Sequence, residues 1–335
     1  MKTSTGIPTS VCFGFLKSLL EVIDTQTPEY LAIAFDLGQP TFRHEADENY
    51  KADRPEPPED LIIDLRNLQD LLKAFNLTVV TAPGYEADDI LGTLAKKASA
   101  AGFRVKILSG DQDLFQLIDV EKGISVLHLA AGKGSTPKEF FSEEVKDKLG
   151  ILPAQVVDYK ALCGDKSDNI PGVRGIGEKT AVKLLNEYGC LSEIYASLDK
   201  IEGANKKKLA VGKAEAEHSQ FMAKIDVNVP LNIDIEDCQV KIFYRSEIEP
   251  ILQRLELQHF INQIPDLEQQ FNRLVKVKFW LDKLEIQQEE ISTNTLAEVG
   301  SDDWFFSAED TKVALQQIST TPRIKPQIID TPEKL

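Results

Sequence analysis

The sequence predicts an α/β fold with a parallel sheet, followed by a region made almost wholly of helices. Over the first 130 residues, short apolar runs rich in Val, Ile and Leu alternate with segments of helical periodicity. This alternation is typical of buried parallel strands that are covered by helices on both faces. From about residue 142 to residue 225 the periodicity is helical, with short turns. The 42% hydrophobic and 27% charged content is that of an ordinary globular protein with a sizeable core.

Each element of this prediction follows from a local pattern. The predicted strands are the apolar runs at residues 31–35, 77–83, 105–110 and 124–130. Helical periodicity fills the segments between them, at residues 11–23, 60–75 and 86–101. Residues 39–58 are polar, charged and proline-bearing, and they predict a mobile loop or arch. Residues 239–243 resemble a strand that returns to the sheet, and residues 246–258 resemble a helix. The acidic, weakly periodic chain beyond about residue 285 predicts a linker.

The formal net charge of −16 is unusual for a protein that binds nucleic acid. The distribution of the charge along the chain, however, leaves a DNA partner possible. Residues 1–164 carry 17 basic and 25 acidic groups, residues 165–224 carry 10 and 9, and residues 225–335 carry 11 and 20. The helical middle region is therefore close to neutral, and the overall charge does not exclude DNA as a partner.

Cysteine and histidine patterns limit the possible chemistry. No CxxC pair is formed by the four cysteines, Cys12, Cys163, Cys190 and Cys238, so we expect reduced thiols in a cytoplasmic protein. No run reaches the ~20 apolar residues that a membrane-spanning helix needs. The four histidines have no zinc spacing and no Ser–His or Cys–His arrangement stands out. Any metal chemistry must therefore come from carboxylates.

Acidic residues follow three predicted strands at the points where the strands end. They are Asp36 after the first, Glu86, Asp88 and Asp89 after the second, and Asp111 and Asp113 after the third. In open parallel sheets this edge is where ligands bind. Each acid alone could be a helix cap or a turn residue. Their recurrence favours a metal site, since crowded carboxylates need a cation and oxygen-only ligands select Mg²⁺ or Mn²⁺.

Such a site suits phosphodiester hydrolysis. Two metal ions about 4 Å apart activate water and stabilise the leaving oxygen in an in-line displacement. Basic residues in the predicted loop lie between two of the acidic groups in sequence, namely Arg43, Lys51 and Arg54. They either stabilise charge that develops on a phosphate or are solvated loop residues. Both interpretations stay open.

The segment GDKSDNIPGVRGIGEKTA, residues 164–181, combines acids with a glycine-rich turn. It contributes Asp165 and Asp168, and then GVRGIG, whose spacing fits neither a Rossmann turn nor a P-loop. Two helical segments flank GVRGIG, which predicts a helix-hairpin-helix. The candidate phosphate-binding residues are Gly172, Gly175, Gly177, Lys179, Thr180 and Lys183. A tight helical hairpin in which the glycines only serve packing is the alternative.

Taken in order, these motifs resemble a known family. FD, TFRHE, YKADRPEPPEDL, GYEADDILGTLA, GDQDLFQL and the hairpin segment occur in the order found in the 5′→3′ exonuclease domain of bacterial DNA polymerase I, in the flap endonuclease superfamily. The resemblance covers about residues 3–260. It implies a PIN-like nuclease core at 1–150 with a helical arch at 39–60, a helix-hairpin-helix region at 151–260, and a linker at 261–335 toward a polymerase region.

The resemblance also implies ligands and partners. In the family, the strand-end acids together with Asp165 and Asp168 hold two divalent ions, Mg²⁺ or Mn²⁺. Lys51 and Arg54 match basic residues of the arch that guides the 5′ end. The hairpin of family members binds the duplex backbone, often with a monovalent cation such as K⁺. From its place in the predicted arch, Arg43 is a further candidate for a DNA contact. We expect a monomeric, cytoplasmic, nucleoid-associated enzyme that cuts 5′ flaps and nicked duplexes in replication and repair.

The resemblance breaks at the N-terminus. Family members begin with a central strand, roughly LLLIDG, whose aspartate is a metal ligand, whereas this chain begins with MKTSTGIPTS. Loss of a central strand exposes the edges of its neighbours, so a weakened fold and impaired cleavage are expected. Three hypotheses follow: a metal-dependent 5′→3′ exonuclease and flap endonuclease, a catalytically impaired DNA-binding fragment, and a purely structural remnant.

Overall fold

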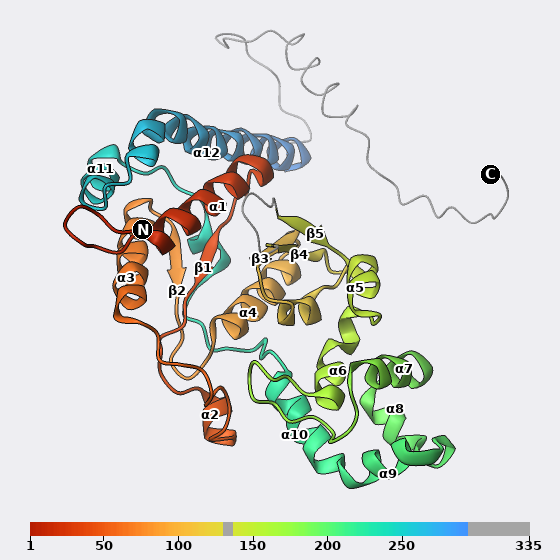
Figure 1. Cartoon of the computed structure of the whole chain (residues 1–335). Coiled ribbons are helices and arrows are strands. Elements are labelled where there is room, and N and C mark those ends of the chain that lie inside the picture. The colour runs from red at the N-terminus through yellow and green to blue at the C-terminus, as the bar shows by residue number, and fades with distance from the viewer. Residues whose placement is uncertain (130–136, 294–335) are drawn as a thin grey trace, which may run out of the picture. The chain divides into compact units, whose positions relative to one another are not determined.

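The computed structural model describes residues 1–129 and 137–293, with side chains as far as residue 275 (Figure 1). Met1–Trp280 form one compact unit, which contains every described strand and the hairpin helices. A second unit begins at Leu281, and its described residues continue a helix. Among the described residues, no helix has both the length and the apolar character needed to cross a membrane.

The predicted strands form two sheets. Strand β1 (Ala32–Ala34) pairs in parallel with β2 (Thr78–Val80), with Ile33 opposite Val79. Strand β3 (Val105–Ser109) pairs in parallel with β4 (Ile124–His128), which pairs antiparallel with β5 (Lys138–Phe140). Strand β5 was not predicted, since three residues are too few to show a period. Within the described residues β1 and β3 each pair with one strand, so no strand joins the two sheets.

Long amphipathic helices pack beside β1 and β2 (Figure 1). They are α1 (Ser10–Gln26), α3 (Glu59–Ala74), α11 (Arg245–Arg254) and α12 (Gln258–Thr293). Spacings of three and four residues place one apolar stripe of each helix in a shared core. The buried side chains include Leu16 and Ile23 of α1, Leu68 and Leu71 of α3, and Phe271 of α12. Burial thus explains the helical periodicity that the sequence shows at residues 11–23 and 60–75.

The second half is helical, as predicted, and Figure 1 shows its helices as a group beside the three-stranded sheet. They are α5 (Ser142–Leu149), α6 (Val156–Cys163), α7 (Glu178–Tyr188), α8 (Leu191–Ala196), α9 (Gly203–Val211) and α10 (Lys213–Ala223). One core joins this group to β3 and β4, with Val126, Leu162 and Leu185 buried together. Helix α4 (Ala87–Ala100) contacts both β1 and β3.

Short 3₁₀ turns complete the chain. They are η1 (Asp113–Leu117), η2 (Pro153–Gln155), η3 (Leu198–Lys200) and η4 (Ile235–Cys238). The core that joins β3 and β4 to the hairpin helices is continuous. It fixes the distance between the end of β3 and the hairpin.

Two segments differ from the sequence-based expectations, and one agrees with them in more detail. The loop or arch expected at 39–58 contains a short helix, α2 (Phe42–Ala46), in keeping with the helical arch that the resemblance implied. The segment 239–243 is no strand, and only Gln239 makes an isolated antiparallel bridge, to Tyr30. The linker expected from residue 261 begins inside α12, because apolar residues such as Phe271 are buried in the core. Its remainder, residues 294–335, lies outside the described residues.

Candidate metal and DNA site

The strand-end acids gather at one place, as the parallel topology predicts. Asp36 lies two residues beyond β1, and its Oδ1 accepts a hydrogen bond of 2.7 Å from the N–H of Ala87 at the start of α4. Asp111 follows β3, and its Oδ1 accepts a hydrogen bond of 2.9 Å from the N–H of Asp113. The negative charges that act on Asp88 come from these three strand ends. The local turns thus aim carboxylates from β1, β2 and β3 into one region.

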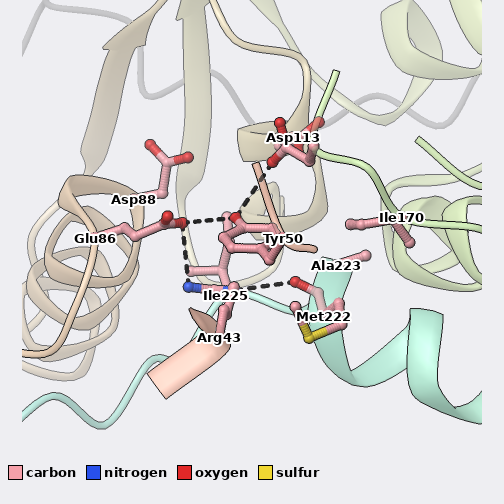
Figure 2. Close-up of a pocket in the computed structure, with 10 residues that line it drawn as sticks. Arg43, Tyr50, Glu86, Asp88, Asp113, Ile170, Met222, Ala223 and Ile225 are labelled. Atoms are coloured by element: carbon pink, nitrogen blue, oxygen red, sulfur yellow. Dashed lines mark hydrogen bonds and ion pairs between the residues drawn. The ribbon is translucent and has the colours of Figure 1, made fainter. Parts of the chain in front are cut away.

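Asp88 is the least neutralised of these acids. Burial first, and then repulsion by Asp111, Asp113, Glu86 and Asp36, raises the pKa of its carboxyl to about 7. In the described part of the chain no hydrogen bond and no ion pair reaches its side chain. Figure 2 shows Asp88 beside Glu86 but outside the network of contacts. An under-neutralised carboxylate among others is the chemistry of a cation site with oxygen ligands, so the donor set fits Mg²⁺ or Mn²⁺.

A lysine from the helical half enters this region. Lys160 of α6 donates hydrogen bonds from its ammonium to Asp113 and to Asp165. Burial raises the pKa of Asp113 and the Lys160 charge opposes this, with a result of about 6. Burial also acts to raise the pKa of Asp165, but hydrogen bonds from Lys160 and Ser167 hold it below its usual range. Sequence reasoning missed Lys160, whose only signal was its place five residues before Asp165.

Arch residues bind the remaining acids. The Nζ of Lys51 lies 2.7 Å from Glu86 and 3.8 Å from Asp168, and Arg54 donates to Asp168 at 2.5 Å. The backbone N–H of Lys51 also donates to the carbonyl of Asp168 at 3.0 Å. Tyr50 donates its hydroxyl between Glu86, at 3.0 Å, and Asp168, at 3.3 Å. The arch basic residues and the acids expected to act together are therefore in contact.

Tyr50, Glu86 and Asp168 line a cavity of about 20 Å³, together with Asp88 and Asp113 (Figure 2). That volume is room for one water-sized occupant. Burial, with the negative charges of Glu86 and Asp168, raises the pKa of Tyr50, so its phenol stays protonated. Among the described residues no three acidic, His or Cys side chains are already arranged around one ion position. Lys160 and the arch cations hold several of the carboxylates instead.

Arg43 and Asp89 are placed differently from their expected roles. Both are buried, at 3% and 0% exposure, and the two guanidinium nitrogens donate to the two carboxylate oxygens at 2.8 Å. Arg43 also donates to the carbonyls of Met222 and Lys224, at 2.9 and 2.7 Å. The sequence suggested a DNA contact at Arg43 and a metal ligand at Asp89. The structure shows a buried, bidentate ion pair that joins the arch, α4 and the end of α10.

The predicted hairpin forms between α6 and α7. Gly172 is buried, and its N–H donates to the hydroxyl of Ser219 at 3.0 Å. Gly175 and Gly177 are exposed. Lys179 and Lys183 are exposed on α7, with Thr180 half-buried beside them. Lys208 of α9 donates to the carbonyl of Gly175 at 2.8 Å, a contact that the sequence did not predict. The exposed Gly175, Gly177, Lys179 and Lys183 are thus accessible to a partner, and together they are called the hairpin face, whereas Gly172 is a packing residue.

Gly172→Ala is expected to lower the free energy of unfolding by about 3 kcal/mol, from overpacking and backbone strain. Gly172 has a φ of 61°, and a Cβ there would lie 2.2 Å from the backbone N of Gly164. The atoms that this Cβ would meet belong to the backbone of Cys163 and Gly164, which cannot shift without a cost in free energy. Urea denaturation measures the change, with Gly177→Ala as the control, because its Cβ would meet nothing within 4 Å. Equal stability of the two variants would contradict the packing role.

Asp88→Asn is expected to raise stability in metal-free solution at higher pH. The raised pKa means that the folded state holds this proton from pH 3.8 up to about pH 7, so stability falls as pH rises through that window. The amide removes this penalty, and its gain should be about 2 kcal/mol larger near pH 8 than near pH 5. Urea denaturation at both pH values, with a chelator present, tests this. A pH-independent effect would contradict the burial and crowding of Asp88.

Family models of the 5′-3′ exonuclease match most of the chain. The model of the N-terminal resolvase-like domain matches residues 1–150, and that of the C-terminal SAM fold matches residues 151–246. DNA polymerase I of Synechocystis sp. is 54% identical over 275 residues, which are 81% of this chain and 28% of that protein. DNA polymerase I of Caldicellulosiruptor bescii is 39% identical over 265 residues, 79% of this chain and 31% of that protein. The chain thus spans less than a third of these relatives.

Solved structures support the fold. The bacteriophage T5 flap endonuclease, in a pseudo-enzyme-product complex with DNA and metal ions, has a TM-score of 0.56 at 19% identity over 73% of this chain and 91% of that chain. The T5 5′-exonuclease with bound zinc has a TM-score of 0.54 at 18% identity over 73% and 90%. At such identities the likeness concerns the fold alone, a PIN-like, resolvase-like half followed by a helical half, as the sequence predicted. By its sequence and its fold, the chain belongs to the 5′-3′ exonuclease family.

Proposed function

We propose that this chain is a divalent-metal-dependent nuclease that hydrolyses DNA from a 5′ end and cuts 5′ flaps, in primer removal and nick processing. One observation carries the proposal: carboxylates from three strand ends meet beside Asp88, which has a raised pKa and no cation of its own in the described residues. Membership of the 5′-3′ exonuclease family supports the direction of cutting.

We assign the acids to two metal groups. The first comprises Asp36, Asp88 and Asp111, which have no ammonium or guanidinium partner among the described residues. The second comprises Asp113, Asp165 and Asp168, with Glu86 between the groups. Bound Mg²⁺ or Mn²⁺ supplies activation of water and stabilisation of the leaving oxygen. Asp89 is left out, since its carboxylate is taken up by Arg43.

The arch and the hairpin bind different phosphates in this proposal. Lys51 and Arg54 lie beside the acids, so they are placed to stabilise charge on the phosphate that is cut. The protonated Tyr50 orients Glu86 and Asp168. The start of α7, where residues 178 and 179 are exposed, holds the duplex backbone farther away, together with Lys179 and Lys183. Sequence-independent binding follows, because these contacts reach only phosphates.

Other parts of the proposal are coarser. We propose that one chain acts on one DNA end, and that it corresponds to the part of the relatives named DNA polymerase I that it matches, which is less than a third of their length. K⁺ at the hairpin would bind backbone oxygens near Gly175, whose carbonyl already accepts a hydrogen bond from Lys208. The alternative function is a DNA-binding fragment with impaired catalysis, which the exposed hairpin face would serve without the metal groups.

A labelled 5′-flap substrate with Mg²⁺ tests the proposal on the full chain. We expect release of the flap and of short 5′ products, abolished by a chelator and by Asp111→Asn. Filter binding in Ca²⁺ measures the affinity for duplex DNA separately from cleavage. No cleavage above the Asp111→Asn background, with duplex binding retained, would refute the nuclease and favour the DNA-binding alternative. Loss of both activities would refute both.

A further inference from the structure

Lys160 lies between carboxylates that come from both halves of the chain. Its ammonium donates to Asp113, four residues beyond the end of β3, and to Asp165, two residues beyond the end of α6. The side chain is 12% exposed, and its neighbours Ala161 and Leu162 are fully buried, so the base of the side chain is fixed. This geometry brings a positive charge to the centre of the acidic cluster.

The ion pairs divide the acids into two classes. Asp36, Asp88 and Asp111 have no cationic partner among the described residues, and these are the proposed first metal group. Each acid of the second group has at least one cationic partner: Asp113 and Asp165 share Lys160, and Asp168 pairs with Arg54 and Lys51. The oxygens that a second metal ion would need are therefore already engaged by protein cations.

We infer that Lys160 is a built-in cation in the place of the second metal ion, and that this ion binds only by displacing the Lys160 ammonium. The inference rests on the proposed metal-dependent function and deepens it. Two close carboxylates cannot both stay ionised without a cation, and an ammonium and a divalent ion compete for the same oxygens. Lysine suits this role because its charge is compact and its stem rotates freely, unlike the rigid fork of arginine.

The inference makes metal binding sequential. The first ion binds at oxygens that are open, and the second binds against the competition of a tethered ammonium. A purely structural ion pair would act differently: without Lys160, the arrangement of Asp113 and Asp165 would loosen, and both ions would bind more weakly. The two interpretations therefore predict opposite changes in the affinity of the second ion.

Electron paramagnetic resonance of free Mn²⁺, titrated into the full chain without DNA, measures both affinities. We expect the wild type to bind one ion, and a second at least tenfold more weakly. Lys160→Met should bind the second ion at least tenfold more tightly than the wild type does. Lys160→Arg should keep the second affinity low. Lys166→Met is the matched control, because Lys166 is exposed in the loop that carries Asp165 and its substitution removes the same charge. It should change the affinity for the second ion less than threefold.

The inference would be overturned if Lys160→Met bound the second Mn²⁺ ion with unchanged or lower affinity than the wild type. It would also be overturned if the wild type and Lys160→Met each bound a single ion. Thermal unfolding of each variant confirms folding, and Lys160→Gln replaces the Met variant if the latter does not fold. Failure of the proposed function has another signature. If Asp88→Asn leaves the first, tight ion in place, the first metal group is refuted whatever Lys160 does.

Discussion

Asp88→Asn is expected to lower Mg²⁺-dependent cleavage of a 5′-flap substrate by at least about a thousandfold, the scale of removing a key electrostatic group from an active site. Asp88 is the acid on which charges from three strand ends converge, and no cation of the described chain offsets it. The amide cannot supply the negative charge that a divalent ion requires. Single-turnover kinetics at saturating enzyme separate this loss from any loss of binding.

Two controls sharpen this result. Asp53→Asn removes an exposed arch carboxylate that makes no ion pair in the described chain, and it should retain cleavage within about threefold, as surface changes usually do. Duplex binding in Ca²⁺ should change little in Asp88→Asn, because the hairpin face is intact. Cleavage by Asp88→Asn at a rate near that of the wild type would place the metal elsewhere.

Arg43→Met is expected to lower the free energy of unfolding by about 3 to 5 kcal/mol, the cost of breaking a buried ion pair from one side. The substitution leaves the Asp89 carboxylate at 0% exposure without either of its guanidinium contacts. It also removes two hydrogen bonds to the carbonyls of Met222 and Lys224. Urea denaturation near neutral pH measures the loss.

The double variant Arg43→Met with Asp89→Leu tests the cause. It removes both buried charges, so it should recover most of the stability that the single variant loses, since apolar replacement of a whole buried pair is often neutral. Arg66→Met, at an exposed residue of α3, should change stability by less than about 0.5 kcal/mol. A loss in Arg43→Met no larger than in Arg66→Met would mean that Arg43 is free to meet DNA, as the sequence suggested.

The sequence could predict that the acids lie close together, because this depends on the order of strands and acids along the chain. Each acid follows a short apolar run, and parallel pairing brings the ends of such runs to one edge, where the charges of Asp36, Glu86 and Asp111 act on Asp88. The hairpin was predictable for the same reason, since the glycines of GVRGIG and the two flanking helices are close in sequence.

The sequence could not predict which acids pair with a protein cation and which do not, because this depends on contacts between distant segments. Asp89 and Asp88 are neighbours in sequence, yet one is buried against Arg43, 46 residues away, and the other has no partner in the described chain. Lys160 and Lys208 carry no motif that marks them, and their roles follow from where α6 and α9 pack. The role of Gly172 could not be predicted either, because it differs from Gly175 in being buried, and the sequence of the turn does not show which glycine is buried.

Fe²⁺-directed hydroxyl-radical cleavage of the full chain tests the central claim most directly. Iron bound in place of Mg²⁺ generates radicals that cut the backbone beside the metal, and mass spectrometry locates the cuts. We expect cuts near Asp36, Asp88 and Asp111, suppressed by excess Mg²⁺ and absent in Asp88→Asn. Cuts confined to other segments, or cuts at these residues that persist in excess Mg²⁺, would contradict a divalent-metal site at the strand ends.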